Sequence, residues 1–262
     1  MRVLLSLGLA LFSAFALAES SRLAIIIDDV GNDYAAAQQL MELPVAVTLA
    51  VLPRLGNSRR IAEEAHQQGR EVMLHQPMQS VHHKHLGPGG LTLDHTRADL
   101  EAVLAANLAS VPHVAGVNNH MGSLLTQDAD AMASLMSVLR DHGGLFFVDS
   151  RTDGQTLAER MARDHGLRSA RRDVFLDNDP DPERIRAQLE QAVQLARERG
   201  SAIAIGHPYP QTLAVLREAL PQWQALGIEL VSASQAIAHQ RSPQSWHASL
   251  SPSPRVVKNS KP

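Results

Sequence analysis

Residues 23–31 have the sequence LAIIIDDVG, an apolar run that ends in two adjacent carboxylates, Asp28 and Asp29. A short run rich in β-branched residues is typical of a strand buried in a parallel sheet. Two acids this close raise each other's pKa unless a positive charge lies beside them, and a bound cation would supply it. Neighbouring residues on an extended strand point to opposite sides, so one Asp could hold a metal while the other faces a water. Alternatively, Asp29 caps the next helix and Asp28 is solvated.

The bulk composition is that of one sizeable domain, or at most two small ones. The chain has 262 residues, is 44% hydrophobic and carries a formal charge of −3. This length is sufficient for a well-buried α/β core. The charge is too small to favour nucleic acid as a partner. An aromatic content of only 3% argues against a long aromatic platform for sugars.

The first 18 residues have the features of a cleavable signal peptide. A positive start at Arg2 precedes the apolar stretch 3–17, and the sequence Ala16-Leu17-Ala18 is a small-x-small cleavage site. We expect cleavage after Ala18, a periplasmic or secreted protein, and a domain over residues 19–238. The alternative is an uncleaved membrane anchor. No later segment is long and apolar enough to cross a bilayer, so no membrane span is expected after cleavage.

The sequence contains no cysteine. An exported protein without cysteine has no disulfides, so its stability must come from its core. Thiolate nucleophiles and cysteine-based zinc sites are excluded as well. Any transition-metal site in this chain must therefore use histidine and carboxylate ligands.

Short apolar runs alternate with amphipathic segments along the chain. Strands are predicted at residues 23–27, 45–51, 72–74, 114–117, 145–148, 202–205 and 228–231, with a weaker candidate in 168–176. Helices are predicted at residues 34–41, 58–68, 128–141, 156–165, 182–199 and 211–220, and another begins after a Thr96 N-cap. Such alternation implies a parallel sheet closed, or nearly closed, into a (β/α) barrel. An open doubly wound sheet is the alternative. Residues 239–262 are rich in Ser and Pro and are predicted to form a disordered tail.

Polar side chains follow the predicted strands repeatedly, at the point where each strand ends. In both architectures the active site lies at these carboxyl ends. The residues found there are Asp28, Asp29, His75, Asn118, Asn119, His120, Asp149, Ser150, Arg151 and His207.

This set of side chains supports metal-assisted hydrolysis. Asp and neutral His bind zinc, and a catalytic site leaves one position open for water. The metal acidifies that water and polarises a carbonyl, while a carboxylate and a histidine transfer protons. Each residue also has a structural interpretation. His75 could pack above the core, His120 and His207 could begin helices, and Asp149 could pair with Arg151.

Residues 82–85 (HHKH) form a second cluster, in a Gly/Pro/His-rich loop. The cluster could bind a metal, but it has no carboxylate partner nearby in sequence. A solvated or substrate-facing loop is the favoured interpretation.

Together, five motifs resemble the divergent polysaccharide deacetylase family, a distant branch of the NodB-type carbohydrate esterases. The resemblance covers residues 22–238. Its motifs, in order, are IDDVG at 27–31, LHQPM at 74–78, GVNNHMGS at 116–123, FVDSRT at 147–152 and IGHP at 205–208.

The resemblance implies a distorted (β/α) barrel of about seven parallel strands and hydrolysis of N- or O-acetyl groups on glycans. It also implies a divalent metal, with zinc as the expected ion, held by one Asp and two His. Carried over by motif, Asp28 is the base, Asp29 and His75 are metal ligands, and His207 is the general acid.

The chain departs from the family pattern at two motifs. Typical members carry a second ligand histidine a few residues after the first, whereas residues 76–79 here are QPMQ. His120 is the candidate for the missing ligand. The sequence Asn118-Asn119-His120 replaces the usual arginine–proline motif. The residues expected to contact substrate or to support the site are Asn118, Asn119, Asp149, Ser150 and Arg151.

Three functions follow from these features. The leading one is an exported, metal-dependent hydrolase that removes acyl groups from an envelope polysaccharide. A glycan-binding or scaffold protein that keeps the barrel without turnover is the second. A metal hydrolase acting on another ester or amide bond is the third, because loops such as 76–95 select the leaving group.

Overall fold

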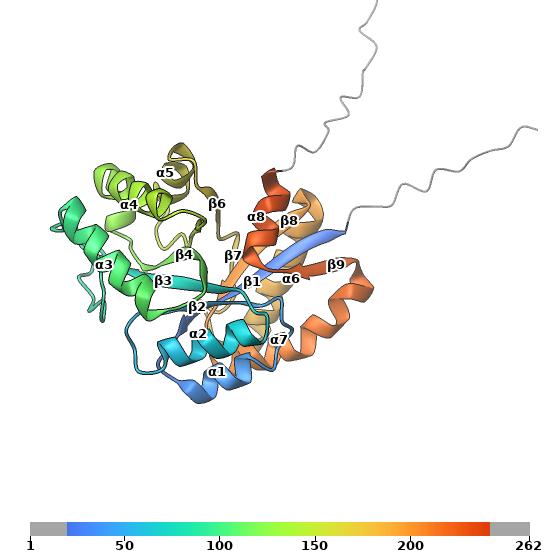
Figure 1. Ribbon diagram of the computed structural model, residues 1–262. Helices are drawn as coiled ribbons and strands as arrows, with labels where there is room; N and C mark the ends of the chain where they lie inside the picture. The colour runs from blue at the N-terminus through green and yellow to red at the C-terminus, as the bar shows by residue number, and fades with distance from the viewer. Residues whose placement is uncertain (1–19, 242–262) are drawn as a thin grey trace, which may run out of the picture.

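The computed structural model describes residues 20–241 (Figure 1). The predicted signal peptide and residues 242–262 of the predicted tail lie outside this range. The strands are β1 (Ser21–Val30), β2 (Thr48–Val51), β3 (Val72–Met78), β4 (Val114–Met121), β5 (Phe146–Asp149), β6 (Arg168–Arg171), β7 (Val174–Phe175), β8 (Ser201–Gly206) and β9 (Ile228–Val231). The helices are α1 (Tyr34–Leu40), α2 (Ser58–Gln67), α3 (Arg97–Ser110), α4 (Ala129–His142), α5 (Ala158–Asp164), α6 (Pro182–Arg199), α7 (Pro210–Trp223) and α8 (Ala233–Arg241), with short 3₁₀ helices at Leu125–Gln127 and Gln224–Leu226.

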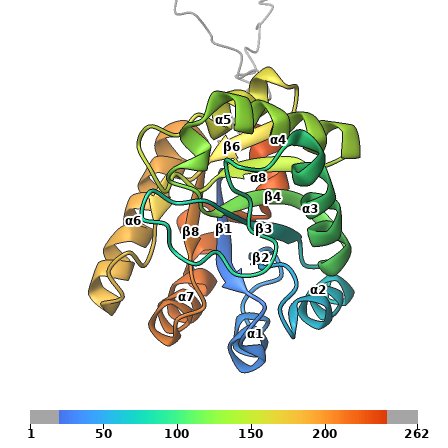
Figure 2. The same ribbon diagram turned by 90° about the vertical axis from the view of Figure 1, so that its left-hand side faces the viewer.

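All strand pairs are parallel, in the order β6-β5-β4-β3-β2-β1-β8-β7. Strand β9 also pairs with β1, alongside residues 21–24, whereas β2 pairs with β1 further along, from Ile26 to Val30. Figure 2 shows the strands at the centre with helices around them. The described residues thus contain nine strands where about seven were expected. The excess arises because the predicted strand at 168–176 is split into β6 and β7, and because β9 and β2 share one side of β1.

The segment between β6 and β7 joins the two edges of the sheet. The Arg172 N–H donates to the Asp149 carbonyl on β5 (2.8 Å), and the next N–H, of Asp173, donates to the Ile203 carbonyl on β8 (2.8 Å). Two consecutive residues, Arg172 and Asp173, therefore bond to strands near opposite edges of the sheet. This short stretch of chain links the two edges. This connection makes the barrel distorted, as expected, and excludes the open doubly wound alternative.

The barrel separates two apolar cores because strand side chains alternate between its faces. Outward-facing residues such as Ile25 and Ile27 pack in a large core that includes helix residues. The inward-facing core is smaller and contains Ile26, Met73, Phe146 and Ile205. Helix α8 contributes Ala233, Ala236 and Ile237 to this inner core.

Local sequence signals account for several helix boundaries. Thr96 forms a capping box with Asp99 at the start of α3, confirming the predicted N-cap. Asp181 caps α6, Pro182 follows at the first turn, and Gly200 ends the helix in a left-handed conformation (φ 81°).

Helix α8 was not predicted, and it contains residues 239–241, which the sequence assigned to the tail. The predicted domain boundary at 238 is therefore three residues short of the described helix end. Ala233, Ala236 and Ile237 of α8 are fully buried against the strands. Within residues 20–241, no helix has the length and apolar character needed to cross a membrane.

Candidate metal centre

A layer of polar side chains lies directly above the inner core, at the carboxyl ends of the strands. Three of these polar residues, Asp28, His75 and His207, each follow an inward-facing residue by two positions and so point to the same side. Asp28 follows Ile26, and His207 follows Ile205 in the same way. The mouth of the barrel holds a cavity of about 640 Å³. The predicted residues that line it are Asp28, Asp29, His75, Asn119, His120, Ser150, Arg151 and His207.

Asp28 and Asp29 reach the same cavity, contrary to the expectation that neighbouring residues would face opposite ways. Asp29 adopts a left-handed backbone conformation (φ 57°), and the pairing of β1 with β2 shifts register between Ile27 and Val30. This irregularity turns the Asp29 carboxylate back toward the barrel mouth. Met121 (φ 54°), the last residue of β4, and Arg151 (φ 49°), two residues after β5, adopt the same conformation. Non-glycine residues held this way are typical of functional sites.

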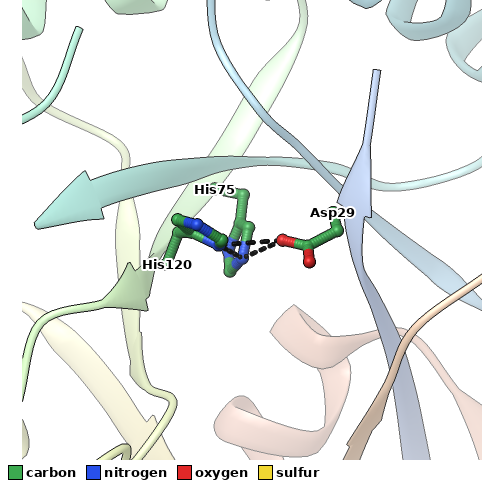
Figure 3. Close-up of side chains that lie close together, drawn as sticks. All are labelled: Asp29, His75 and His120. Carbon is green, nitrogen blue, oxygen red and sulfur yellow. Dashed lines mark hydrogen bonds and ion pairs between the residues drawn. The ribbon is translucent and has the colours of Figure 1, made fainter. Parts of the chain in front are cut away.

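Asp29, His75 and His120 bring three potential ligand atoms together (Figure 3). Asp29 Oδ1 lies 2.8 Å from His120 Nδ1 and 3.2 Å from His75 Nε2. The two ring nitrogens are themselves 3.2 Å apart. The three atoms come from the ends of β1, β3 and β4, which are far apart in sequence.

This triangle fits a small metal ion. Ligand atoms about 2.0–2.2 Å from a tetrahedral zinc lie about 3.3–3.6 Å from one another, somewhat further apart than the 2.8–3.2 Å seen here, so a small outward movement of the side chains would admit the ion. Asp29 Oδ1 is buried, and its close contacts to the two ring nitrogens lack hydrogen-bond geometry. A buried carboxylate oxygen held against two imidazole nitrogens without a hydrogen bond has the chemistry of a cation site.

Asn118 connects the predicted base to a predicted ligand. Its Nδ2 donates to Asp28 Oδ1 (2.7 Å), and its Oδ1 accepts from His75 Nδ1 (2.8 Å). With Nδ1–H used in this way, His75 Nε2 is left to bind a metal. Asn118 itself is fully buried and is not part of the cavity lining.

Burial and neighbouring charges shift the pKa values of Asp28, Asp29 and His75 in opposite directions. Burial raises the pKa of Asp28, and the neighbouring His75 only partly offsets that effect. The pKa of Asp29 is raised by burial but lowered more strongly by the imidazoles of His120 and His75, so it lies well below its usual range. Burial lowers the pKa of His75, but the charges of Asp28 and Asp29 outweigh it and raise the pKa to about 9.

His207 is paired with Asp177, a residue that the sequence analysis did not identify. Asp177 Oδ1 accepts from His207 Nδ1 (2.9 Å), and Oδ2 accepts from the His207 backbone N–H (2.6 Å) and from Thr212 Oγ1 (2.7 Å). Burial lowers the pKa of His207, but the hydrogen bond and charge of Asp177 raise it by more. The rings of Phe175 and Tyr209 lie 5.6 and 5.3 Å from the His207 ring.

Arg172 lines the cavity and was also not identified from the sequence. Its Nε donates to the Ser150 carbonyl (2.6 Å) and its Nη2 to the Arg151 carbonyl (2.8 Å). The guanidinium lies over the Phe175 ring, 4.5 Å from its centre. The only feature of the sequence that draws attention to Arg172 is the pair Arg171-Arg172, and this pair does not indicate that Arg172 lies in the cavity.

Asp149 is the one predicted strand-end residue that has no place in the site. It neither lines the cavity nor bonds to a residue of the metal centre within the described chain. Its carboxylate instead accepts from the Arg151 N–H (2.8 Å), Thr156 Oγ1 (2.9 Å) and the Glu159 N–H (3.4 Å). Asp149 thus shapes the turn after β5, and burial raises its pKa. Asn119 lines the cavity and also accepts from the Ser150 N–H (2.8 Å).

A second hollow, of about 540 Å³, lies between α6 and α7, away from the strand ends. Its described lining includes Leu189 and Trp223 but no histidine or aspartate. Its titratable groups are Arg and Glu side chains such as the exposed ion pair of Arg186 and Glu218 (2.9 Å), whereas the buried Asp and His groups lie at the barrel mouth. The candidate site is therefore placed at the barrel mouth.

A distorted parallel barrel with an Asp–His–His cluster and an Asp–His pair at its strand ends defines a protein of the deacetylase-like barrel class. The chain belongs to the divergent polysaccharide deacetylase family, whose sequence profile matches residues 25–237. The resemblance seen in the sequence motifs is thereby confirmed.

Two relatives have been described only as uncharacterized proteins. One, from Haemophilus influenzae, is 39% identical over 211 residues, which cover 80% of this chain and 75% of the relative. The other, YibQ from Escherichia coli, is 38% identical over 199 residues, 76% of this chain. The match spans only 62% of the length of YibQ.

Solved structures show the same fold. An uncharacterized protein from Agrobacterium tumefaciens superposes with a TM-score of 0.78 at 24% identity, over 84% of this chain and 91% of its own. A CE4 family pseudoenzyme from Bacillus anthracis gives a TM-score of 0.52 at 13% identity, over 83% of this chain and 66% of its own. At these identities the likeness concerns the fold alone.

Proposed function

We propose that this protein is a metal-dependent hydrolase that removes acetyl groups from a polysaccharide of the cell envelope. The observation that carries the proposal is the triangle of Asp29 Oδ1, His75 Nε2 and His120 Nδ1, with edges of 2.8 to 3.2 Å, beside the buried carboxylate of Asp28. Membership of the polysaccharide deacetylase family supports the substrate class.

Asp29, His75 and His120 would hold the ion, and zinc suits one oxygen and two nitrogen ligands. When bound, such an ion supplies a Lewis acid that polarises a carbonyl and lowers the pKa of a water. The protein contributes the orientation of the ligands. The Asn118 carbonyl oxygen fixes the His75 ring, so that its Nε2 lone pair points to the other two ligand atoms.

Asp28 would act as the general base. Its carboxylate is buried and fixed by Asn118, and burial raises its pKa, which makes it a better proton acceptor than a solvated Asp. Asp28 would take the proton of the attacking water at the acetyl carbon. A fixed, partly desolvated carboxylate of this kind does not need to reorganise before it accepts a proton.

His207 faces the same cavity and would donate a proton to the departing sugar nitrogen or oxygen. Its Nε2 lies 3.8 Å from Asp29 Oδ2, and its Nδ1 is held by Asp177. Asp177 therefore orients the ring and favours its protonated form, in which Nε2 carries the proton to be transferred.

The proposal includes export to the envelope, supported by the signal-like residues 1–18. Fractionation of cells producing the full chain should place it outside the cytoplasm, shortened by 18 residues. A full-length cytoplasmic protein would contradict this part of the proposal.

The activity is tested by acetate release from peptidoglycan and from chitin-type oligomers, with the protein loaded with zinc. Wild-type protein should release acetate, and Asp28→Asn should reduce the rate by at least about a hundredfold, because the base is lost while its shape is kept. Zinc content and the circular dichroism spectrum of Asp28→Asn serve as controls for the metal and the fold. Absence of acetate release by zinc-loaded wild-type protein from every polymer would contradict the proposal.

A glycan-binding protein without turnover is the second candidate. It is favoured by one observation: Gln76, next to His75, is not free to serve as a ligand. The Gln76 amide is engaged with the Gly89 carbonyl (2.9 Å) and with Asn107 Nδ2 (2.7 Å). Glycan binding that is unchanged in Asp28→Asn, with no acetate released by wild type, would favour this candidate.

A further inference from the structure

Three cationic side chains line the cavity without a carboxylate partner: Lys84, Arg151 and Arg172. Elsewhere in the described chain, arginines commonly pair with Asp or Glu at 2.6–3.8 Å. No ion pair among the described residues includes any of these three. Unpaired cations gathered at one cavity leave a positive field in the place where a substrate must bind.

Arg151 is held in position by its backbone while its guanidinium remains available. Its N–H donates to Asp149 Oδ1 (2.8 Å), and its carbonyl accepts from Arg172 Nη2 (2.8 Å). Its φ of 49° is unfavourable for a residue with a side chain, and such conformations persist where the surrounding structure imposes them. The guanidinium is exposed and makes no hydrogen bond to the described residues. The turn thus presents this cation at the cavity.

Ser150 provides an independent sign of a missing partner. Its hydroxyl oxygen is buried, lines the cavity, and has no hydrogen-bond partner among the described residues. Its backbone is fixed on both sides, by Asn119 Oδ1 at the N–H (2.8 Å) and by Arg172 Nε at the carbonyl (2.6 Å). A buried hydroxyl without a partner is rare, and a ligand acceptor in the cavity would satisfy it.

The charges of the cavity lining also favour an anion. The carboxylates in the lining are Asp28, Asp29 and Asp153, against the three cations. Asp28 and Asp29 belong to the metal centre, where a divalent ion would balance their charge. Only Asp153 then remains to offset Lys84, Arg151 and Arg172, so the metal-loaded cavity carries a positive excess.

We propose that this cavity selects an acidic glycan, in which a sugar close to the scissile acetyl group bears a carboxylate or a phosphate. Arg151 and the Ser150 hydroxyl contact the anionic group from the turn after β5. Lys84 attracts it from the facing loop, and Arg172 holds the turn in place through its two carbonyl contacts. This inference rests on the proposed function, because it specifies the substrate class of the same site.

The test compares binding of acidic and neutral oligomers to the full chain carrying Asp28→Asn, which prevents turnover. The probes are an N-acetylglucosamine tetramer, a tetramer of the same length with lactyl carboxylates on alternate sugars, and a phosphate-substituted tetramer. By calorimetry, at least one acidic oligomer should bind about tenfold more tightly than the neutral one, with a preference that falls as salt rises. Whichever of the two acidic oligomers binds more tightly shows whether the cavity prefers a carboxylate or a phosphate.

Arg151→Gln and Lys84→Gln, each added to Asp28→Asn, should remove most of this preference. Arg160→Gln is the matched control, because Arg160 is exposed on α5, makes no ion pair among the described residues and lies outside the cavity lining. Ser150→Ala should weaken binding of the acidic oligomer more than that of the neutral one. Circular dichroism confirms that each variant is folded.

Equal binding of acidic and neutral oligomers would overturn the inference, as would a preference that persists in both Arg151→Gln and Lys84→Gln. The outcome is separable from that of the proposed function. Acetate release by wild-type protein without any acidic preference would retain the hydrolase and reject the acidic substrate. Acidic preference without acetate release from any oligomer would retain the anion site and reject the hydrolase.

Discussion

Asn118 holds Asp28 and His75 with opposite ends of one amide, donating to the carboxylate at 2.7 Å and accepting from the imidazole at 2.8 Å. One buried side chain on β4 therefore sets the orientation of the candidate base on β1 and of a candidate metal ligand on β3. In the proposed function, this arrangement would make proton transfer and metal binding depend on the same residue. It also explains why an amide, with one donor end and one acceptor end, stands at this position.

Replacing Asn118 with Leu should weaken metal binding. The substitution keeps the volume but frees the His75 ring and leaves Asp28 buried without its donor. Loss of a partner that orients a ligand typically costs about 10–100-fold in metal affinity, and we expect a loss of that size. Zinc competition titrations measure it, with Asn178→Leu as control, because Asn178 lines the cavity but makes no hydrogen bond to the described residues. An affinity for Asn118→Leu within twofold of wild type would contradict this role.

Asp177→Asn should move the pH–rate profile. The hydrogen bond and charge of Asp177 raise the pKa of His207. As a general acid, His207 is active when protonated, so activity is present below its pKa and is lost as pH rises through it. Without the Asp177 charge the pKa falls, and the alkaline limb of kcat/KM against pH should shift to lower pH. Asp179→Asn, an exposed neighbour, should leave the profile unchanged, and an unchanged profile in Asp177→Asn would argue against His207 as the acid.

Metal removal should lower the melting temperature, because the three ligands come from the ends of β1, β3 and β4. An ion present at a hundred times its Kd stabilises the folded state by about 2.7 kcal/mol, corresponding to about 5–10 °C for a domain of this size. Differential scanning calorimetry before and after chelation measures the shift. The melting temperature of Asp29→Ala should not depend on added zinc. A zinc-dependent rise in melting temperature of the same size in that variant would indicate that zinc binds elsewhere.

Gly116→Ala should destabilise the barrel below the site. A Cβ at this position would lie 2.5 Å from the Phe146 ring. Phe146 is packed in the inner core, so its ring cannot move away easily. Overpacking of this kind costs about 1–3 kcal/mol in the free energy of unfolding. Urea titration measures the change. Gly56→Ala is the control, because an added Cβ there meets no atom within 4 Å, and it should cost less than about 1 kcal/mol.

The sequence patterns were sufficient to predict most strands and to bring most candidate site residues to one end of the sheet. Apolar runs followed by polar residues identified the ends of β1, β3, β4, β5 and β8. Alternation within those runs could also have separated Asp149 from the cavity, since it follows the inward-facing Val148 by one residue. The pattern alone, however, does not say which face of a strand is the inner one.

Other features depend on tertiary contacts that leave no local signal. β7 has only two residues and follows three charged ones, so no apolar run marks the segment that closes the barrel. Asp177 acquires its role through His207, 30 residues later in the chain. The left-handed conformation of Asp29 was also not predicted, because Asp is compatible with an ordinary extended strand end.

The most direct test of the metal centre is the metal content of purified wild-type protein and of His120→Ala, measured by elemental analysis. His120 is the decisive residue because we propose that it replaces the second ligand histidine of typical family members. The wild-type chain should carry one divalent ion, expected to be zinc, and His120→Ala should lose nearly all of it while keeping its circular dichroism spectrum. Wild-type protein that remains metal-free after zinc loading, or His120→Ala that retains a full equivalent, would contradict the account.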